Sequence, residues 1–155
     1  MKAGVRAAAS AAALAAAALT GCSSSSHPNA KATVAAKASV EANTTACSSA
    51  AKSVALPSGF PASFPMPPGT VVTAADDRGD AGFVVSGVTP TAFKDVLAAL
   101  QTDLPAKGFT MKDGETEPHD AESDWTSAGY DGRWAIREIP QCHGDTAVSV
   151  VARKK

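Results

Sequence analysis

Apolar residues recur at helical spacing in one segment of the chain, between residues 89 and 108. The apolar stripe consists of Phe93, Val96, Leu97, Leu100 and Leu104. A stripe of this kind predicts a helix that buries one face. Thr89 is suited to cap this helix, Pro90 to occupy its first position, and Gly108 to end it.

Alternating and β-branched runs predict strands before and after this helix. Two strands are expected at residues 70–75 and 82–88, joined by a turn of Asp and Gly residues at 76–80. A third strand begins at residues 109–111, and the last strand spans residues 146–153. With a hairpin between them, the predicted order is β-β-α-β-β-β-β. This order is typical of an α+β fold with two layers, in which one helix packs on an antiparallel sheet.

The hairpin is indicated by Asp131-Gly132, which is the strongest turn signal in the chain. A two-residue turn at this point pairs Gly129 with Trp134, and Trp125 with Glu138. Because side chains alternate along a strand, both tryptophans are then expected on one face of the sheet, with Gly129 leaving room for Trp134.

The opposite face of the predicted hairpin is expected to carry Tyr130, Arg133 and Arg137. Exposed Tyr and Arg side chains are enriched where proteins recognise partners. These three residues are therefore the candidate binding face. The alternative is the ordinary polar outside of a half-buried antiparallel sheet.

Residues 57–69 contain five of the ten prolines and favour an extended path. Phe60 and Phe64 lie four residues apart, and each is followed by proline. We expect them to pack this lead-in arm (residues 57–69) onto the domain. The alternative is a proline-rich ligand for another protein.

The N-terminus has the pattern of an export signal. Lys2 and Arg6 precede an alanine-rich apolar segment at residues 7–18, which is followed by Leu19-Thr20-Gly21-Cys22. This motif resembles the lipobox of bacterial lipoproteins. The resemblance implies cleavage before Cys22 and a diacylglyceryl group on its thiol, which would anchor the protein to a membrane. The alternative is an ordinary secretory signal followed by a chance cysteine.

Three parts of the chain follow from this interpretation: a signal peptide (residues 1–21), a lipid-anchored tether (22–56) and a small domain (57–155). The tether has no aromatic residue and cannot bury a core. The expected location is the extracytoplasmic face of the cell membrane. There the remaining cysteines, Cys47 and Cys142, are expected to form one disulfide; two free thiols are the alternative.

Charge and histidine spacing exclude several kinds of site. Two of the 14 basic residues lie in the signal, so the mature chain has 12 Lys and Arg against 15 Asp and Glu. A mildly acidic chain does not indicate nucleic-acid binding. His27, His119 and His143 lack the paired spacing of a transition-metal site, and no cofactor is indicated. Six acids at residues 113–124 could supply oxygen ligands for Ca²⁺, but a charged connection between strands is the preferred interpretation.

The whole domain also has a familiar pattern. It combines Phe-Pro-x-Pro-Pro-Gly at residues 64–69, a helix that ends in Leu-Pro-Ala-Lys-Gly-Phe at 104–109, and a closing Thr-x-Val-x-Val at 146–150. Residues 60–153 are thereby similar to small domains of uncharacterised secreted lipoproteins of high-GC Gram-positive bacteria. The resemblance implies fold and location, and it carries over no catalytic or binding residue.

Function is expected to be binding. The chain has neither a Gly-x-Ser-x-Gly motif nor a phosphate-binding glycine loop. The leading hypothesis is a membrane-anchored binding or interaction module, whose partner is a cell-envelope protein or a small ligand. The alternatives are a small cell-envelope hydrolase and a purely structural envelope component.

Overall fold

The computed structural model describes residues 46–155. The predicted signal peptide and the predicted lipidation site, Cys22, lie outside these residues. The described elements are the 3-10 helix η2 (Ser48–Ala50), β1 (Val71–Asp77), the 3-10 helix η3 (Gly79–Ala81), β2 (Phe83–Thr89), α1 (Phe93–Ala106), β3 (Thr110–Thr116), β4 (Asp120–Thr126), β5 (Tyr130–Glu138) and β6 (Thr146–Lys154).

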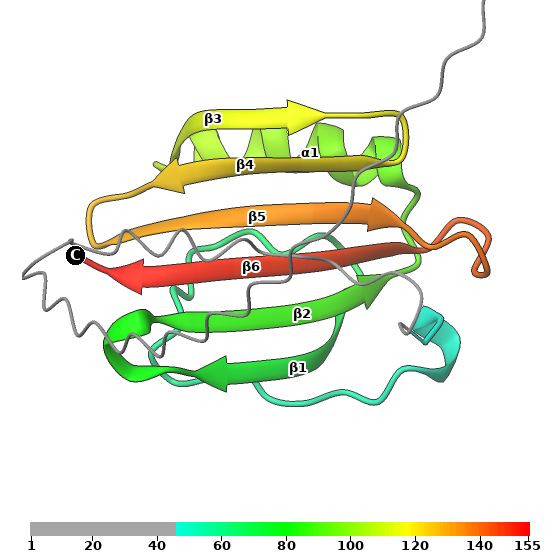
Figure 1. Cartoon of the computed structure of the whole chain (residues 1–155), viewed down its shortest axis with the longest axis horizontal. Helices are drawn as coiled ribbons and strands as arrows, with labels where there is room; N and C mark the ends of the chain where they lie inside the picture. The colour runs from blue at the N-terminus through cyan, green and yellow to red at the C-terminus, as the bar shows by residue number, and fades with distance from the viewer. Residues whose placement is uncertain (1–45) are drawn as a thin grey trace, which may run out of the picture. The chain divides into compact units, whose positions relative to one another are not determined.

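The six strands form one antiparallel sheet with the order β1-β2-β6-β5-β4-β3, and α1 covers one of its faces (Figure 1). The predicted α+β fold with its order β-β-α-β-β-β-β is confirmed. The C-terminal strand β6 lies between β2 and β5, and its first seven residues are buried. A strand covered on both faces needs a nearly continuous run of small and apolar residues, which β6 has.

Helix α1 buries the predicted apolar stripe through Phe93, Val96, Leu100 and Leu104. The helix also terminates as predicted, through Gly108. Gly108 has a φ of 82°, and the amides of Gly108 and Phe109 donate to the carbonyl oxygens of Pro105 and Leu104, at 3.0 Å each. This pair of bonds is a Schellman motif, which satisfies carbonyls at the end of the helix.

The predicted start of the helix is wrong. The helix begins at Phe93, and its N-cap position is Ala92. Thr89 instead ends β2, where its hydroxyl donates a hydrogen bond of 2.6 Å to the carbonyl oxygen of Pro68. Because this bond ties Thr89 to the lead-in arm, its side chain does not cap the helix, and Pro90 lies before the first turn.

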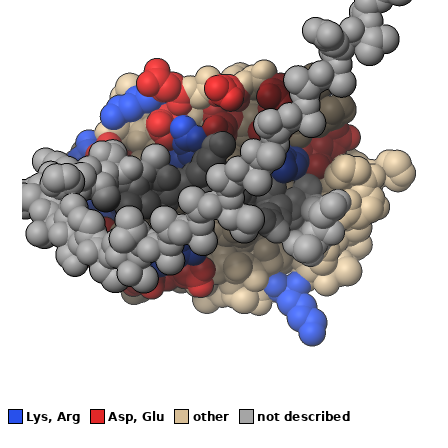
Figure 2. All heavy atoms as spheres, in the orientation of Figure 1, with Lys and Arg blue, Asp and Glu red and all other residues tan. Residues whose placement is uncertain are grey.

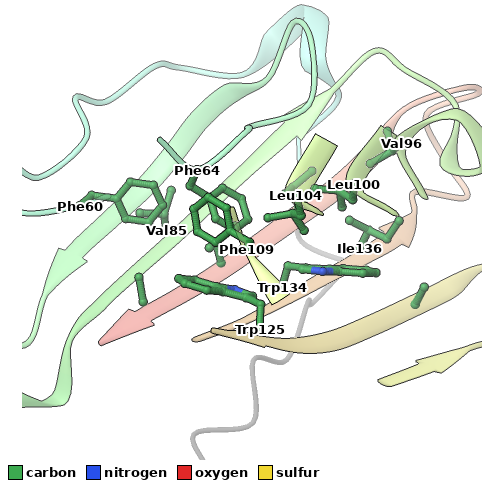
Figure 3. Close-up of a cluster of buried hydrophobic side chains, with 14 of the residues drawn as sticks. Phe60, Phe64, Val85, Val96, Leu100, Leu104, Phe109, Trp125, Trp134 and Ile136 are labelled. Atoms are coloured by element: carbon green, nitrogen blue, oxygen red, sulfur yellow. The ribbon is translucent and has the colours of Figure 1, made fainter. Parts of the chain in front are cut away.

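The lead-in arm packs on the same side of the sheet as α1, as expected. Phe60 and Phe64 are buried in one hydrophobic core with residues of the helix and the sheet (Figure 3). The ring centre of Trp125 lies 5.4 Å from that of Phe64 and 5.2 Å from that of Phe109. Aromatic pairs at these separations add to the stabilisation from buried area. The arm therefore completes a core that one helix alone leaves uncovered.

The register of the β4–β5 hairpin differs from the prediction. The turn lies at residues 127–129, where the amide of Ser127 donates to the carbonyl oxygen of Tyr130 at 2.8 Å. Trp125 therefore faces Gly132 rather than Glu138. This shift of six residues is even, so Trp125 and Trp134 still share the helix side of the sheet, as predicted.

Trp125 gives a physical reason for this register. A Cβ atom at position 132 would lie 2.3 Å from the ring of Trp125 and 2.0 Å from the carbonyl oxygen of Val151. Only glycine fits beneath the indole ring. Gly132 thus lies within β5 and leaves room for the ring of Trp125. The turn forms three residues earlier in the chain than predicted.

The predicted Cys47–Cys142 disulfide is present, with a Cα–Cα distance of 5.4 Å. It joins the residue before η2 to the loop between β5 and β6. The sulfur atoms belong to a second, smaller apolar cluster on the face of the sheet opposite α1. Its buried members are Val88, Ala135, Ile139, Cys142, Ala147 and Val151.

Replacement of Gly132 by alanine should destabilise the fold. The new methyl group would overlap backbone and indole atoms, and overpacking of this kind costs roughly 1–3 kcal/mol of the free energy of unfolding. The matched control is Gly129→Ala, because nothing lies within 4 Å of a Cβ atom at that position. Urea denaturation of both variants measures the difference. Equal stability of the two variants would contradict the proposed role of Gly132.

Candidate functional site: the acidic edge of the sheet

Ion pairs cover the face of β4 and β5 that points away from α1. Antiparallel pairing places Asp124 opposite Arg133, and Asp120 opposite Arg137. The Nε atom of Arg133 lies 2.7 Å from Oδ1 of Asp124, and its second contact is with Glu122, also at 2.7 Å. Arg137 contacts Asp120 at 2.5 Å. Both arginines thus have carboxylate partners within their own sheet.

Arg133 is the better shielded of the two arginines. Its side chain is 23% exposed, and that of Glu122 is 20% exposed. The hydrogen bond to Asp124 is the largest effect on Arg133, and it raises the pKa of the guanidinium despite partial burial. Ion pairs of this partly shielded kind are more effective than fully exposed ones, because water screens them less.

The three residues of the predicted binding face lie on two different sides of the sheet. Arg133 and Arg137 share the open face, but Tyr130 lies on the helix side, three residues before Arg133 on the same strand. Its hydroxyl donates a hydrogen bond of 3.0 Å to the carbonyl oxygen of Gly59 in the lead-in arm. The expectation that all three share a face is therefore wrong. It followed from placing Tyr130 before the turn, whereas Tyr130 begins β5.

The acidic segment at residues 113–124 is a hairpin, not the expected loop. Its acids are Asp113, Glu115, Glu117, Asp120, Glu122 and Asp124, and five of the six lie in β3 or β4. Figure 2 shows Asp and Glu side chains gathered over these strands. The acids occur at every second position in each half of the segment. This period of two is the strand signal that the sequence interpretation missed.

The two rows of acids differ in their partners. Asp120, Glu122 and Asp124 of β4 are bound by the arginines of β5. Within residues 46–155, Asp113, Glu115 and Glu117 form no ion pair. The row along β3 therefore takes part in no ion pair among the described residues, and Lys112 is the one basic residue of that strand.

Strand β3 is also the outermost strand at its end of the sheet. Six of its seven residues are exposed. At the other end of the sheet, the amide of Val54 donates a hydrogen bond of 2.8 Å to the carbonyl oxygen of Val72 on the outer side of β1. Among the described residues, no such backbone bond reaches the outer side of β3. We call residues 110–117, with their outward backbone groups, the β3 edge.

The other polar candidates have structural explanations. His119 contacts Glu138 at 2.5 Å in an exposed pair where β4 begins. The turn after β1 is held by the amide of Gly79, which donates to the side chain of Asp77 at 2.9 Å, and it contains η3. His143 is exposed in the β5–β6 loop, and His27 lies outside the described residues.

No protein-family model matches the chain, and no curated protein or solved structure matches it. The function is therefore inferred from the motifs of the sequence and from the geometry of residues 46–155.

Asp131, where β5 begins, should make stability depend on pH. A hydrogen bond with its cross-strand neighbour Thr126 is the main cause that lowers the pKa of Asp131 below 3.8, and the nearby charge of Lys155 adds to it. A carboxyl group whose pKa is lowered by folding stabilises the fold at pH values above its pKa in the unfolded chain. This contribution is lost as the pH falls through the pKa of the group in the folded protein.

Asp131→Asn should therefore lower the urea midpoint at pH 7, and the difference from the parent protein should shrink toward zero as the pH falls below 3.8 and through the lowered pKa of the folded state. Asp113→Asn, which removes an acid with no ion pair in the described chain, serves as the control and should have little effect. A deficit of Asp131→Asn that stays constant down to the lowest pH would show that charge is not its cause.

Proposed function

We propose that this protein is a lipid-anchored extracytoplasmic lipoprotein whose sheet domain binds a partner through the β3 edge. The motif Leu19-Thr20-Gly21-Cys22 supports the lipid anchor. The Cys47–Cys142 disulfide supports an exported location, since disulfides persist in oxidising compartments. Within residues 46–155, no helix has the length and apolarity needed to cross a membrane.

The observation that carries the binding proposal is the exposed outer side of β3. An edge strand presents unpaired backbone donors and acceptors, and an extended segment of another chain can add to it as a further strand. Backbone hydrogen bonds then supply affinity, and side chains at alternate positions supply specificity. The opposite edge, at β1, is already contacted by Val54.

The acids of β3 define the chemistry of the partner. Asp113, Glu115 and Glu117 form no ion pair among the described residues, so a segment with Lys or Arg at alternate positions would complement them. Cross-strand pairs of opposite charge each contribute roughly 0.2–1 kcal/mol, and like charges in opposition are unfavourable. Two copies of β3 would oppose acid to acid, which disfavours self-association. The proposed partner is therefore a basic extended segment of a cell-envelope protein.

The lipid anchor is tested by Cys22→Ala in cells. The parent protein should fractionate with membranes, and mass spectrometry of its N-terminal peptide should show the acyl mass on Cys22. The variant should lack this mass and leave the membrane fraction, because no acyl chain holds it there. Ser23→Ala changes the neighbouring residue and should stay anchored. Membrane retention of Cys22→Ala, or a parent peptide without acyl mass, would refute the anchor.

The β3 edge is tested by titrating the isotopically labelled protein with a nine-residue peptide of alternating lysine and valine. Amide shifts in nuclear magnetic resonance spectra should be largest within residues 110–117, and amide exchange there should slow. The double variant Asp113→Asn, Glu115→Gln should bind about tenfold more weakly, as expected from the loss of two cross-strand charge pairs.

Two controls separate strand addition from general charge attraction. The double variant Asp76→Asn, Asp80→Asn removes the same charge near the opposite edge, and its affinity for the peptide should stay within about twofold of the parent. A peptide with glutamate in place of lysine should not bind. Shifts centred away from β3, or equal losses in the two double variants, would rule out the β3 edge as the binding site.

A further inference from the structure

Two hydrogen-bond donors in the aromatic core lack acceptors. Trp125 and Trp134 are 1% and 2% exposed. Among the described residues, the Nε1 atom of each indole has no hydrogen-bond partner. Trp125 faces Gly132, and Trp134 follows Gly132 by two positions on β5, so both indoles lie in one small region on the helix side of the sheet (Figure 3). A buried N–H group without an acceptor destabilises a fold, which points to an acceptor that the described residues do not supply.

The lead-in arm supplies the cover over Trp125. Phe64 is 5% exposed, and the centre of its ring lies 5.4 Å from that of Trp125 and 5.7 Å from that of Phe109. The ring of Phe60 packs against that of Phe64, with centres 6.0 Å apart. Because the arm belongs to neither the sheet nor α1, its two phenylalanines can leave the core while both of those elements stay in place. Their departure would uncover Trp125.

Hydrogen bonds tie the arm to the domain only at its two ends. Among the described residues, no hydrogen bond joins residues 60–67, which we call the strap, to the sheet or to α1. Before the strap, the hydroxyl of Tyr130 donates to the carbonyl oxygen of Gly59 at 3.0 Å; after it, the hydroxyl of Thr89 donates to that of Pro68 at 2.6 Å. Proline has no amide hydrogen to donate, and three of the eight strap residues are prolines. The strap is therefore held down by its phenylalanine side chains alone.

We propose that the strap covers a binding site for an apolar chain that carries a neutral carbonyl group, such as a fatty-acid ester. The chain takes the place of the phenylalanine rings of the strap, and its carbonyl oxygen accepts a hydrogen bond from the indole N–H group of Trp125. Asp145 is the one charged residue buried among the described residues, and it lies beside the disulfide. A charged ligand group under the strap would thus have no buried counter-charge, which favours a neutral acceptor.

The test titrates methyl octanoate into the isotopically labelled full-length chain with Cys22→Ala, which carries no acyl group of its own. The chain has two tryptophans, so nuclear magnetic resonance spectra contain two indole N–H signals. Methyl octanoate should move the indole proton of Trp125 downfield, because a hydrogen-bonded proton is deshielded, and the shift should saturate at one ligand per chain. Nonane, which has no acceptor, should cause no such shift. The octanoate ion should bind at least about tenfold more weakly than its ester, because its charge would be buried.

Tyr130→Phe tests the strap, because it removes the hydroxyl that bonds to Gly59 and keeps the aromatic ring. The ligand binds only when the strap is lifted, so its apparent affinity rises with the population of that state. Loss of one hydrogen bond should make methyl octanoate bind up to about fivefold more tightly. Thr102→Val is the matched control: it removes a hydroxyl that donates to the carbonyl oxygen of Ala98 on the exposed side of α1, at 2.9 Å. Its affinity should stay within about twofold of the parent. Equal affinities of the two variants would refute the strap.

A second measurement removes the indole N–H groups without changing the size of the rings. Biosynthetic replacement of both tryptophans by benzothienylalanine, which has sulfur in place of the N–H group, should weaken binding of methyl octanoate about fivefold, the effect of one lost hydrogen bond. Isothermal calorimetry measures both forms. Equal binding by the two forms, or no binding of methyl octanoate by the parent chain, would overturn the site. Neither outcome affects the binding of a basic peptide at the β3 edge, so the two proposals can fail separately.

Discussion

The contact between Trp125 and Gly132 sets the register on which the charged half of the sheet depends. The indole ring occupies the space that a side chain at position 132 would need. Once Trp125 faces Gly132, antiparallel pairing places Asp124 opposite Arg133 and Asp120 opposite Arg137. The ion pairs on the open face are therefore a consequence of aromatic packing on the helix face, because one register serves both faces of a sheet.

The same register explains why the acids of β3 and β4 have different surroundings. Strand β4 lies beside β5 and contacts its arginines, whereas β3 has β4 as its only neighbour among the described strands. Glu115 of β3 faces Glu122, whose carboxylate is already bound by Arg133. Among residues 46–155, the acids of the inner strand β4 are thus held in ion pairs, and those of the outer strand β3 are not. Position in the sheet, rather than composition, distinguishes the two rows.

The sequence predicted the features that depend on local patterns. The apolar stripe of α1, the terminating Gly108, the anchoring phenylalanines of the lead-in arm and the single disulfide were all confirmed. The hairpin register was predicted wrongly because Asp131-Gly132 has strong local turn propensity. The size of Trp125 opposes that turn, because its ring needs a glycine opposite it. This steric effect can be assessed only when the residue opposite Trp125 is known. Tertiary packing overrode the local signal here.

The candidate sites were harder to predict for a related reason. An acid at every second position is a strand signal, but apolar alternation is the usual guide, so the sequence predicts a charged connection between strands at residues 113–124. The position of Asp145 beside the disulfide depends on a pairing between distant segments and on three backbone bonds within a loop. No spacing rule contains that information.

The disulfide ties two distant segments of the described chain together. The described part of the chain is tied at Cys47 to the β5–β6 loop, next to the central strand β6. A bond at this point connects the lead-in to the most buried strand of the sheet. The hydrogen bond from the amide of Ser48 to the carboxylate of Asp145 joins the same two segments beside the covalent link.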